Sequence, residues 1–206
     1  ESGQLAAELA AQGFTGPETI LEGPKGFYAG LCPDPKPGAV TAAPQAPWAV
    51  HDTSIKPWPC CRHTHPAIDA ALELSPQIGN RAISRVLVET YGAAIDVCDR
   101  IHPDTEYQAK FSLQHTVAAA LADGVVDFTS FDAAARDRHR DGAAKVVLSK
   151  AEPYASAYPV HWGTGVKVTL SDGVELAASR HDAKGDPEAP LSRADMVAKA
   201  TMLMRL

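Results

Sequence analysis

The feature that most constrains the fold is the segment at residues 104–124, DTEYQAKFSLQHTVAAALADG. Asp104 and Glu106 place negative charge in a first helical turn, and Gly124 is a good C-terminal cap, so the pattern predicts one helix over this segment. Between residues 111 and 122 the helix would be apolar on nearly every side, whereas a surface helix has a polar face. We therefore expect it to be buried between two layers of structure.

Strand patterns occupy the sequence on both sides of this helix. Alternation and β-branched residues predict strands at 83–98 (ISRVLVETYGAAIDVC), 144–151 (AKVVLSKA), 163–173 (GTGVKVTLSDG) and 174–182 (VELAASRHD). The turn Ser-Asp-Gly joins the last two as a hairpin. Because helices and strands alternate without a regular βαβ rhythm, the pattern indicates an α+β fold with helical extensions.

Three more helices and one long loop complete the expected organisation. A helix through residues 1–12 ends at Gly13, a second includes AIDAALEL and ends at Ser75 and Pro76, and a third over 192–206 begins with Ser192 as its N-cap. Proline and glycine are too frequent between residues 14 and 50 for regular elements, so this stretch is expected to be a long ordered loop.

Composition narrows the class of function and the setting. A formal net charge of −6 over 206 residues argues against a nucleic acid or an anionic membrane as the main partner. Apolar runs such as TVAAALA are far shorter than the roughly 20 residues that span a bilayer. Four cysteines are too few for a disulfide scaffold, so we expect a soluble protein in the reducing cytoplasm.

The segment KPWPCCRHTHPAIDAALEL, residues 56–74, concentrates polar chemistry before a helix. A zinc site could use Cys60 or Cys61 with His63 and His65, but the second, distant ligand pair of a structural zinc site is missing. Alternatively, the segment is only a helix start, with Thr64 or His65 as cap, Pro66 in the first turn and Asp69 near the positive helix end.

The helix-start interpretation does not explain the crowd of cations at this position. Lys56, Arg62, His63 and His65 would all lie near a positive helix terminus, where cations are disfavoured. An anion bound there would remove the conflict. We therefore favour a third interpretation, a loop that binds a carboxylate and transfers protons, with histidine and lysine side chains as acids and bases.

Four stretches together resemble the MmgE/PrpD family. They are GFTGPETILEGPKGF (13–27), TSIKPWPCCRHTHPAIDAALEL (53–74), AKFSLQHTVAAALADG (109–124) and AKGDPEAPLS (183–192), and they agree with the family in order and spacing. The family includes 2-methylcitrate dehydratases, cis-aconitate decarboxylases and an iminodisuccinate epimerase. The chain would correspond to the later part of a family chain of about twice this length, which would explain why it begins with Glu1.

The resemblance implies a domain arrangement. Residues 1–75 would belong to an all-helical domain and carry the long loop and the site motif, residues 80–190 would form an α+β lid, and residues 191–206 would be the helix that returns to the helical domain. The site would be completed by an N-terminal half or by a second copy of the chain. Several acid and base groups of the family lie in that first half.

The resemblance also implies a reaction and its residues. The family works without metal or organic cofactor: it abstracts a proton α to a carboxylate of a small polycarboxylate and, in the dehydratases, then eliminates water. Lys56, Cys61, His65 and His115 are the catalytic candidates, and Lys56, Arg62 and His63 the candidates for substrate binding. Cys61 stands where some members carry a histidine, and His115 where some carry a tyrosine. A satisfied core histidine is an equal alternative for His115.

Two other outcomes stay open at this point. The chain could be a non-catalytic module that binds a small polycarboxylate or a protein partner, or it could belong to an epimerase or decarboxylase of the same family. Zinc binding at the Cys60–His65 segment is the weaker alternative. Calorimetry with citrate-like acids separates binding from turnover.

Overall fold

The computed structural model describes residues 1–43 and 48–204 and divides the chain into two compact units, Glu1–Trp48 and Ala49–Leu206. The expected domain arrangement, with a boundary at residues 75–80, stays a prediction. The helix that ends there packs on two strands of the second unit. Part of the predicted long loop, residues 44–47, lies outside the described residues.

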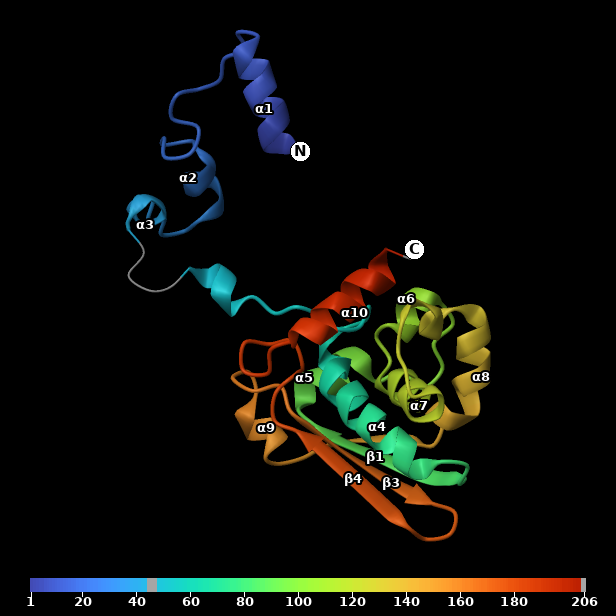
Figure 1. Ribbon diagram of the computed structural model, residues 1–206. Coiled ribbons are helices and arrows are strands. Elements are labelled where there is room, and N and C mark those ends of the chain that lie inside the picture. The colour runs from blue at the N-terminus through green and yellow to red at the C-terminus, as the bar shows by residue number, and fades with distance from the viewer. Residues whose placement is uncertain (44–47, 205–206) are drawn as a thin grey trace. The chain divides into compact units, whose positions relative to one another are not determined.

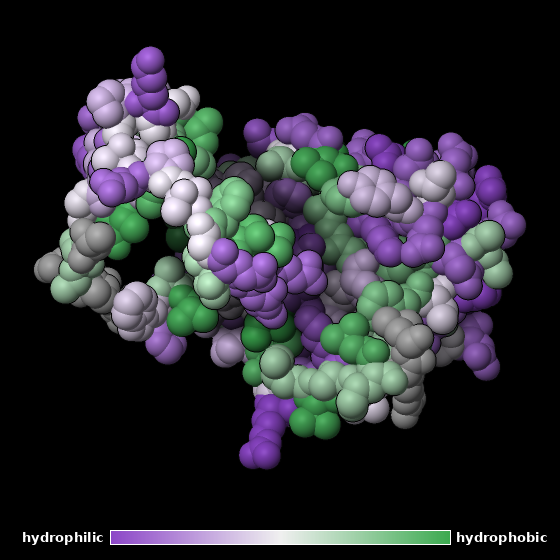
Figure 2. Space-filling model, turned by 90° about the horizontal axis from the view of Figure 1, so that it is seen from above, coloured by the Kyte–Doolittle hydropathy of each residue, from purple (hydrophilic) through white to green (hydrophobic). Residues whose placement is uncertain are grey.

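The first unit consists of short helices joined by loops (Figure 1). Its helices are α1 (Ser2–Ala11), α2 (Phe27–Leu31) and α3 (Gly38–Thr41). As expected, the first helix ends just before Gly13, whose φ of 86° suits glycine. Within the described part of this unit, α1 and α2 bury no residue, and Leu5, Phe14 and Leu31 are more than half exposed. Hydrophobic residues of this unit lie open on the surface in Figure 2.

The second unit is built on a four-stranded mixed sheet in the order β2-β1-β3-β4. The strands are β1 (Ile83–Thr90), β2 (Val146–Lys150), β3 (Thr164–Leu170) and β4 (Glu175–Arg180). β2 runs parallel to β1, whereas β3 is antiparallel to both β1 and β4. The α+β class and the Ser-Asp-Gly hairpin expected from the sequence are therefore confirmed.

Helices and short 3₁₀ turns cover this sheet and lead into and out of it. They are η1 (Ala49–Asp52), η2 (Arg62–Thr64), α4 (His65–Ile78), α5 (Gly92–Cys98), α6 (Glu106–Ala109), α7 (Leu113–Asp123), η3 (Phe128–Phe131), α8 (Ala133–Ala143), α9 (Tyr154–Ala157) and α10 (Arg193–Leu203). α4 packs on β3 and β4, α7 packs beside α4 and reaches β2, and α8 packs on α7 (Figure 1). The expected N-cap Ser192 accepts a hydrogen bond from Asp195 N–H, which starts α10 as predicted.

The core lies between the sheet and α4 and α7. Alternate strand residues, including Val86, Val88, Val166 and Val168, are at most 2% exposed, because successive side chains of a strand point to opposite faces. Ile68 and Leu74 of α4 are fully buried against them. α4 is thus held rigidly on the sheet, and its N-terminus carries the polar segment that the sequence analysis selected.

The helix expected over 104–124 is two helices. α6 ends at Ala109 and α7 begins after Ser112, whose hydroxyl oxygen accepts a hydrogen bond from the His115 N–H. A serine side chain that caps a new helix competes with continuing the old one, and this explains the break. The expected burial is confirmed, since every residue from Leu113 to Leu121 is buried, and Gly124 ends α7 at a φ of 65°.

Three other element predictions differ from the structure. The strand expected over 83–98 stops at Thr90, and Gly92 begins α5, because Ala94 and Cys98 are buried four residues apart on one helical face. α4 does not end at Pro76 but continues to Ile78, as a proline in the last turn removes only one helical hydrogen bond. The polar helix α8 was not predicted.

None of the helices in the described ranges has both the length and the hydropathy needed to cross a membrane. This agrees with the expectation from the short apolar runs of the sequence.

Candidate functional site

The candidate site is the segment Ile55–His65, called the site loop below, which leads into α4. It is anchored at its start by a hydrogen bond from Ile55 N–H to the carbonyl of Gly185, at 2.8 Å. Gly185 has a φ of 96°, and a Cβ at this position would lie 2.0 Å from the Ile55 oxygen. Further along, Cys61 N–H donates to the Lys110 carbonyl at 2.9 Å. The loop is therefore fixed on both sides of its lysine.

Lys56 lies exposed at the surface near this anchor. Its carbonyl oxygen accepts a hydrogen bond from Lys199 Nζ of α10 at 2.6 Å. Burial is the main cause that lowers the pKa of His65, and the charges of Lys56 and Lys199 add to it. The arrangement brings two cations from distant parts of the sequence to one place, which favours an anionic ligand.

Cys61 is half-buried beside Cys98 of α5 and has an acidic thiol. A hydrogen bond from the Cys98 thiol is the main cause that lowers the Cys61 pKa to about 6; burial opposes it, and the His63 N–H and the Lys56 charge assist. The neighbouring Cys60 is buried against Thr64, and burial raises its pKa to about 12. At neutral pH Cys61 is thus a thiolate, able to accept a proton, whereas Cys60 is a neutral thiol.

Arg62 is engaged by other residues of the chain. Its guanidinium forms an ion pair with Asp186, whose side chain is 5% exposed, and its Cζ lies 3.9 Å from the ring centre of Trp162. The sequence analysis expected a bound anion to relieve the cations at the start of α4. Asp186 supplies that anion for Arg62 from 124 residues away.

His63 belongs to an aromatic cluster under the site loop. Its Nδ1 lies 2.9 Å from the Tyr91 hydroxyl, and its ring stacks on Trp162 with centroids 4.6 Å apart at an angle of 14°. Burial and the Arg62 charge lower the His63 pKa, so the ring is neutral at pH 7. The ring therefore acts here as a packing group with one polar contact.

His65 begins α4 and is only 1% exposed. Its ring meets Trp58 edge to face at 5.3 Å, and burial lowers its pKa to about 3. Its Nε2 has no hydrogen-bond partner among residues 1–43 and 48–204. Thr64 occupies the N-cap position of α4, as one interpretation expected, but its hydroxyl donates to the Cys61 carbonyl and makes no cap hydrogen bond. Asp69 pairs with Arg180.

A known family domain covers the site loop from Trp58 onward. The model of the MmgE/PrpD C-terminal domain matches residues 58–206. The chain belongs to the MmgE/PrpD family. It is similar to cis-aconitate decarboxylase of Mus musculus, with 26% identity over 94% of this chain and 41% of the relative. Cis-aconitate decarboxylase of Homo sapiens is 26% identical over 94% of the chain and 42% of the relative. The chain thus spans about two fifths of the length of these relatives.

His115, the fourth catalytic candidate in this MmgE/PrpD chain, lies in α7, a helix that contacts the η2 turn of the site loop. It is 1% exposed, and its Nε2 lies 2.7 Å from the Ser130 carbonyl. Its ring is about 6 Å from those of Phe131 and His139. Burial lowers its pKa, and the Ser130 carbonyl opposes this. The structure brings together Lys56, Cys61 and His65 but surrounds His115 with its own buried partners.

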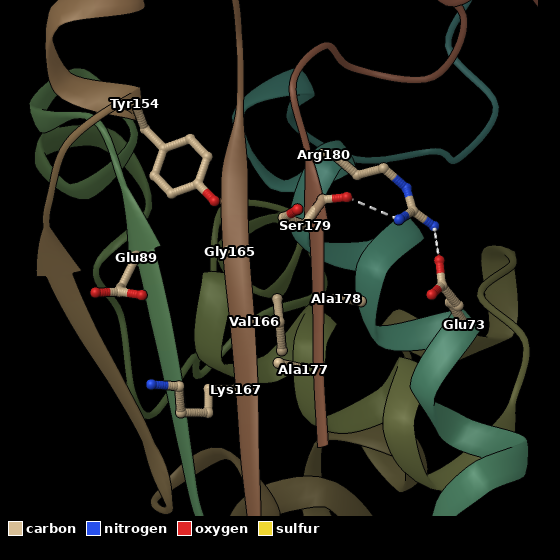
Figure 3. Close-up of a pocket in the computed structure, with 10 residues that line it drawn as sticks. All are labelled: Glu73, Glu89, Tyr154, Gly165, Val166, Lys167, Ala177, Ala178, Ser179 and Arg180. Carbon is tan, nitrogen blue, oxygen red and sulfur yellow. Dashed lines mark hydrogen bonds and ion pairs between the residues drawn. The ribbon is translucent and has the colours of Figure 1, made fainter. Parts of the chain in front are cut away.

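A separate cavity of this MmgE/PrpD domain lies on β3 and β4 and holds none of the predicted site residues (Figure 3). Its volume is 530 Å³, and Glu89, Tyr154 and Lys167 line it together with Arg180. Arg180 bonds to Asp69 and, at 2.8 Å, to Glu73. The charged residues that line the cavity are two carboxylates, Glu73 and Glu89, and two cations, Lys167 and Arg180, so the cavity offers no net positive charge to a polycarboxylate.

Sequence reasoning missed two groups that the fold brings together. Asp186 was not selected from the sequence, and only the tertiary structure shows its pairing with Arg62. His161, His181 and Asp182 also form a cluster, although His161 is remote in sequence from the other two. Neither group has a spacing signal that a single sequence could reveal.

Proposed function

We propose that this chain supplies part of the active site of a cofactor-free lyase that acts on a small polycarboxylate. The observation that carries the proposal is the acidic thiol of Cys61, in the electrostatic range of Lys56, on an anchored loop. A thiolate at neutral pH is a base, and a nearby ammonium group stabilises the charge that develops when a proton leaves a carbon next to a carboxylate.

The proposed reaction resembles that of a 2-methylcitrate dehydratase. The Cys61 thiolate accepts the proton α to a carboxylate, and the C–H electron pair becomes the new C=C bond. The β-hydroxyl leaves with a proton as water. Lys56 binds the carboxylate and stabilises the enolate. Loss of carbon dioxide after binding is the alternative outcome, favoured by the similarity to two proteins named cis-aconitate decarboxylase, and return of the proton on the other face would give an epimerase.

The remaining predicted residues support the site in this proposal. Arg62 and His63 hold the loop through Asp186 and Trp162. A catalytic role for His65 or His115 stays a prediction, because each is 1% exposed and would need its surroundings to open before it could contact a substrate.

The site is proposed to be completed by other residues outside this chain. The family match concerns a C-terminal domain, and the chain spans about two fifths of the length of the relatives to which it is similar. The exposed apolar side chains of α1 and α2, including Leu5, Phe27 and Leu31, favour a partner that covers them, either an N-terminal half or a second copy. The proposed assignment of residues 1–75 to a helical domain, 80–190 to a lid and 191–206 to a return helix belongs to the same proposal.

The test uses the complete protein that carries this chain. Proton NMR in D₂O follows 2-methylcitrate, citrate and cis-aconitate, and reports exchange of the α-proton as well as product. Lys56→Met and Cys61→Ser should each lower kcat by about 100-fold or more. Lys167→Met, which removes an exposed lysine from β3, is the matched control and should keep normal turnover.

Two results would contradict the lyase proposal. Normal turnover by Lys56→Met would show that the reaction does not need Lys56, the residue on which the lyase proposal depends. Tight calorimetric binding of a polycarboxylate with neither exchange nor product would instead support the non-catalytic binding module, for which the short coverage of the relatives is the specific argument.

A further inference from the structure

Three side chains with metal-binding atoms meet where the β3–β4 hairpin joins the rest of the domain. His161 lies just before β3, and His181 and Asp182 lie just after β4. Each offers one ligand atom, and the three atoms lie within 4.8 Å of one another. The two imidazole centroids are 4.1 Å apart. This cluster is separate from the site loop and has no part in the proposed reaction.

Asp182 is the centre of the cluster. Its Oδ1 lies 2.7 Å from His161 Nδ1, and its Oδ2 lies 2.9 Å from His181 Nδ1. The carboxylate thus bonds to both imidazole rings and holds them toward one point.

The backbone fixes this arrangement in advance. A Cβ on Gly163 would lie 2.8 Å from the Arg180 oxygen and 2.9 Å from the His181 oxygen, so this position needs a glycine. The close approach brings the chain before β3 against the chain after β4. His161 N–H also donates to the Ala157 carbonyl at 3.0 Å. The two histidines are thus held together by main-chain packing and do not depend on their own side-chain contacts.

We propose that His161, His181 and Asp182 bind a divalent transition-metal ion of the zinc type. Ligand atoms about 2.0–2.2 Å from a tetrahedral zinc ion lie roughly 3.3–3.6 Å from one another. Each histidine nitrogen now bonded to Asp182, at 2.7 and 2.9 Å, therefore needs to move away from the carboxylate by less than about 1 Å to admit the ion. The His181 side chain is 67% exposed. A water molecule from solvent can therefore take the fourth position.

The ligand set decides the class of metal. Two imidazole nitrogens and one carboxylate oxygen suit Zn²⁺, Co²⁺, Ni²⁺ or Cu²⁺, whereas Mg²⁺ and Ca²⁺ prefer sites made of oxygen atoms. The ion would cross-link the two ends of the hairpin. Trp162 follows His161 directly and contacts both Arg62 and His63, so the cross-link would also steady the cluster beneath the site loop.

Co²⁺ titration of the metal-free protein tests the site, since tetrahedral Co²⁺ absorbs visible light far more strongly than octahedral Co²⁺. We expect one ion per chain, an intense visible band, displacement of Co²⁺ by Zn²⁺ and no displacement by an equal concentration of Mg²⁺. His181→Ala should weaken binding by more than about tenfold, the least that loss of even an outer partner of a metal ligand costs. Because His181 is exposed, this variant should fold normally, which far-UV circular dichroism verifies.

The control variant is His102→Ala, which removes an exposed histidine elsewhere in the domain and should bind as tightly as the parent chain. Asp182→Asn provides a second variant that keeps the shape of the side chain but removes its charge. Equal Co²⁺ affinity in the parent chain, His181→Ala and Asp182→Asn would overturn the proposal, and so would a spectrum of octahedral Co²⁺ alone.

Discussion

Arg62 and Asp186 form an ion pair that joins the site loop to the turn before α10. The Asp186 carboxylate is almost fully buried, while the guanidinium also covers the Trp162 ring. Removal of Arg62 would leave a buried carboxylate without its cation, and such a loss is more costly than the absence of the whole pair.

The first prediction concerns this pair. Arg62→Met should lower the free energy of unfolding by about 2 kcal/mol, less than the 3–5 kcal/mol of a fully buried pair because the arginine side chain is 29% exposed. Urea unfolding measures the change. Arg85→Met, on an exposed strand position, should change it by less than about 0.5 kcal/mol. If the double variant with Asp186→Leu is no more stable than Arg62→Met alone, the pair is not the source of the loss.

Gly185 supports the second prediction. Gly185→Ala adds a Cβ 2.0 Å from the Ile55 oxygen and should shift the start of the site loop. Gly173→Ala is a matched control, since Gly173 has a similar φ of 88° but nothing within 4 Å of the added atom. We expect Gly185→Ala to cost about 1–3 kcal/mol more than Gly173→Ala in thermal or urea unfolding, the usual penalty of overpacking. Equal losses of stability in the two variants would contradict this prediction and would mean that the site loop shifts without an energetic penalty.

The third prediction is the reactivity of Cys61. Its rate of alkylation by iodoacetamide should rise with pH through about 6 and then level off, because the reactive thiolate forms over that range. Cys60 and Cys98, whose pKa values are raised chiefly by burial and by the bond to Cys61 respectively, should react slowly at pH 7. Mass spectrometry of peptides distinguishes the sites, and the exposed Cys32 serves as an internal reference.

A change at Cys98 tests the stated cause. Cys98→Ala removes the hydrogen bond that chiefly lowers the Cys61 pKa, so the pH midpoint of Cys61 alkylation should move upward. An unchanged midpoint would show that Lys56 and the His63 N–H suffice to hold the thiolate.

The fourth prediction follows from the buried His65. Its pKa in the folded chain is about 3, below the 6.5 of an unfolded histidine, so the unfolded state binds the proton first as pH falls. The contribution of neutral His65 to the free energy of unfolding is fully present above pH 6.5 and is lost as the pH falls from 6.5 toward about 3. The stability of the parent chain minus that of His65→Leu should decrease by about 2 kcal/mol between pH 8 and pH 5. His65→Gln is the second variant if leucine impairs folding, and a difference independent of pH would refute the assignment.

The sequence was most informative where one interaction dominates. Alternation predicted β2, β3 and β4, because one face of each strand packs on the helices. Ser192 predicted the start of α10 because its cap is local, closed within three residues by Asp195. Predictions failed where local signals compete. The strand expected to continue to Cys98 is replaced in its second half by α5. The polar α8 was not predicted, because the Asp132 cap and packing on α7 stabilise it.

The candidate site could be predicted in part for a similar reason. Lys56 and Cys61 are five residues apart, so the loop keeps them near each other, and the resemblance to the MmgE/PrpD family is confirmed by its domain match. The pairing of Arg62 with Asp186 and the cluster of His161 with His181 arise from chain segments that only the folded sheet brings together. Periodicity and spacing in a single sequence do not reveal such long-range contacts.

The order of the strands along the chain also determines when β1 can pair with its neighbours during synthesis. Thr90 of β1 and Gly163, just before β3, are hydrogen-bonded partners 73 residues apart. At roughly 5–20 residues per second, β1 leaves the ribosome about 4–15 s before β3 can pair with it. α4 is already made at that time, but both edges of β1 lack a partner until β2 pairs with one of them, and the other edge stays open until β3 is made. A ribosome that stalls within this interval would release a chain with an unpaired central strand, a ready template for aggregation.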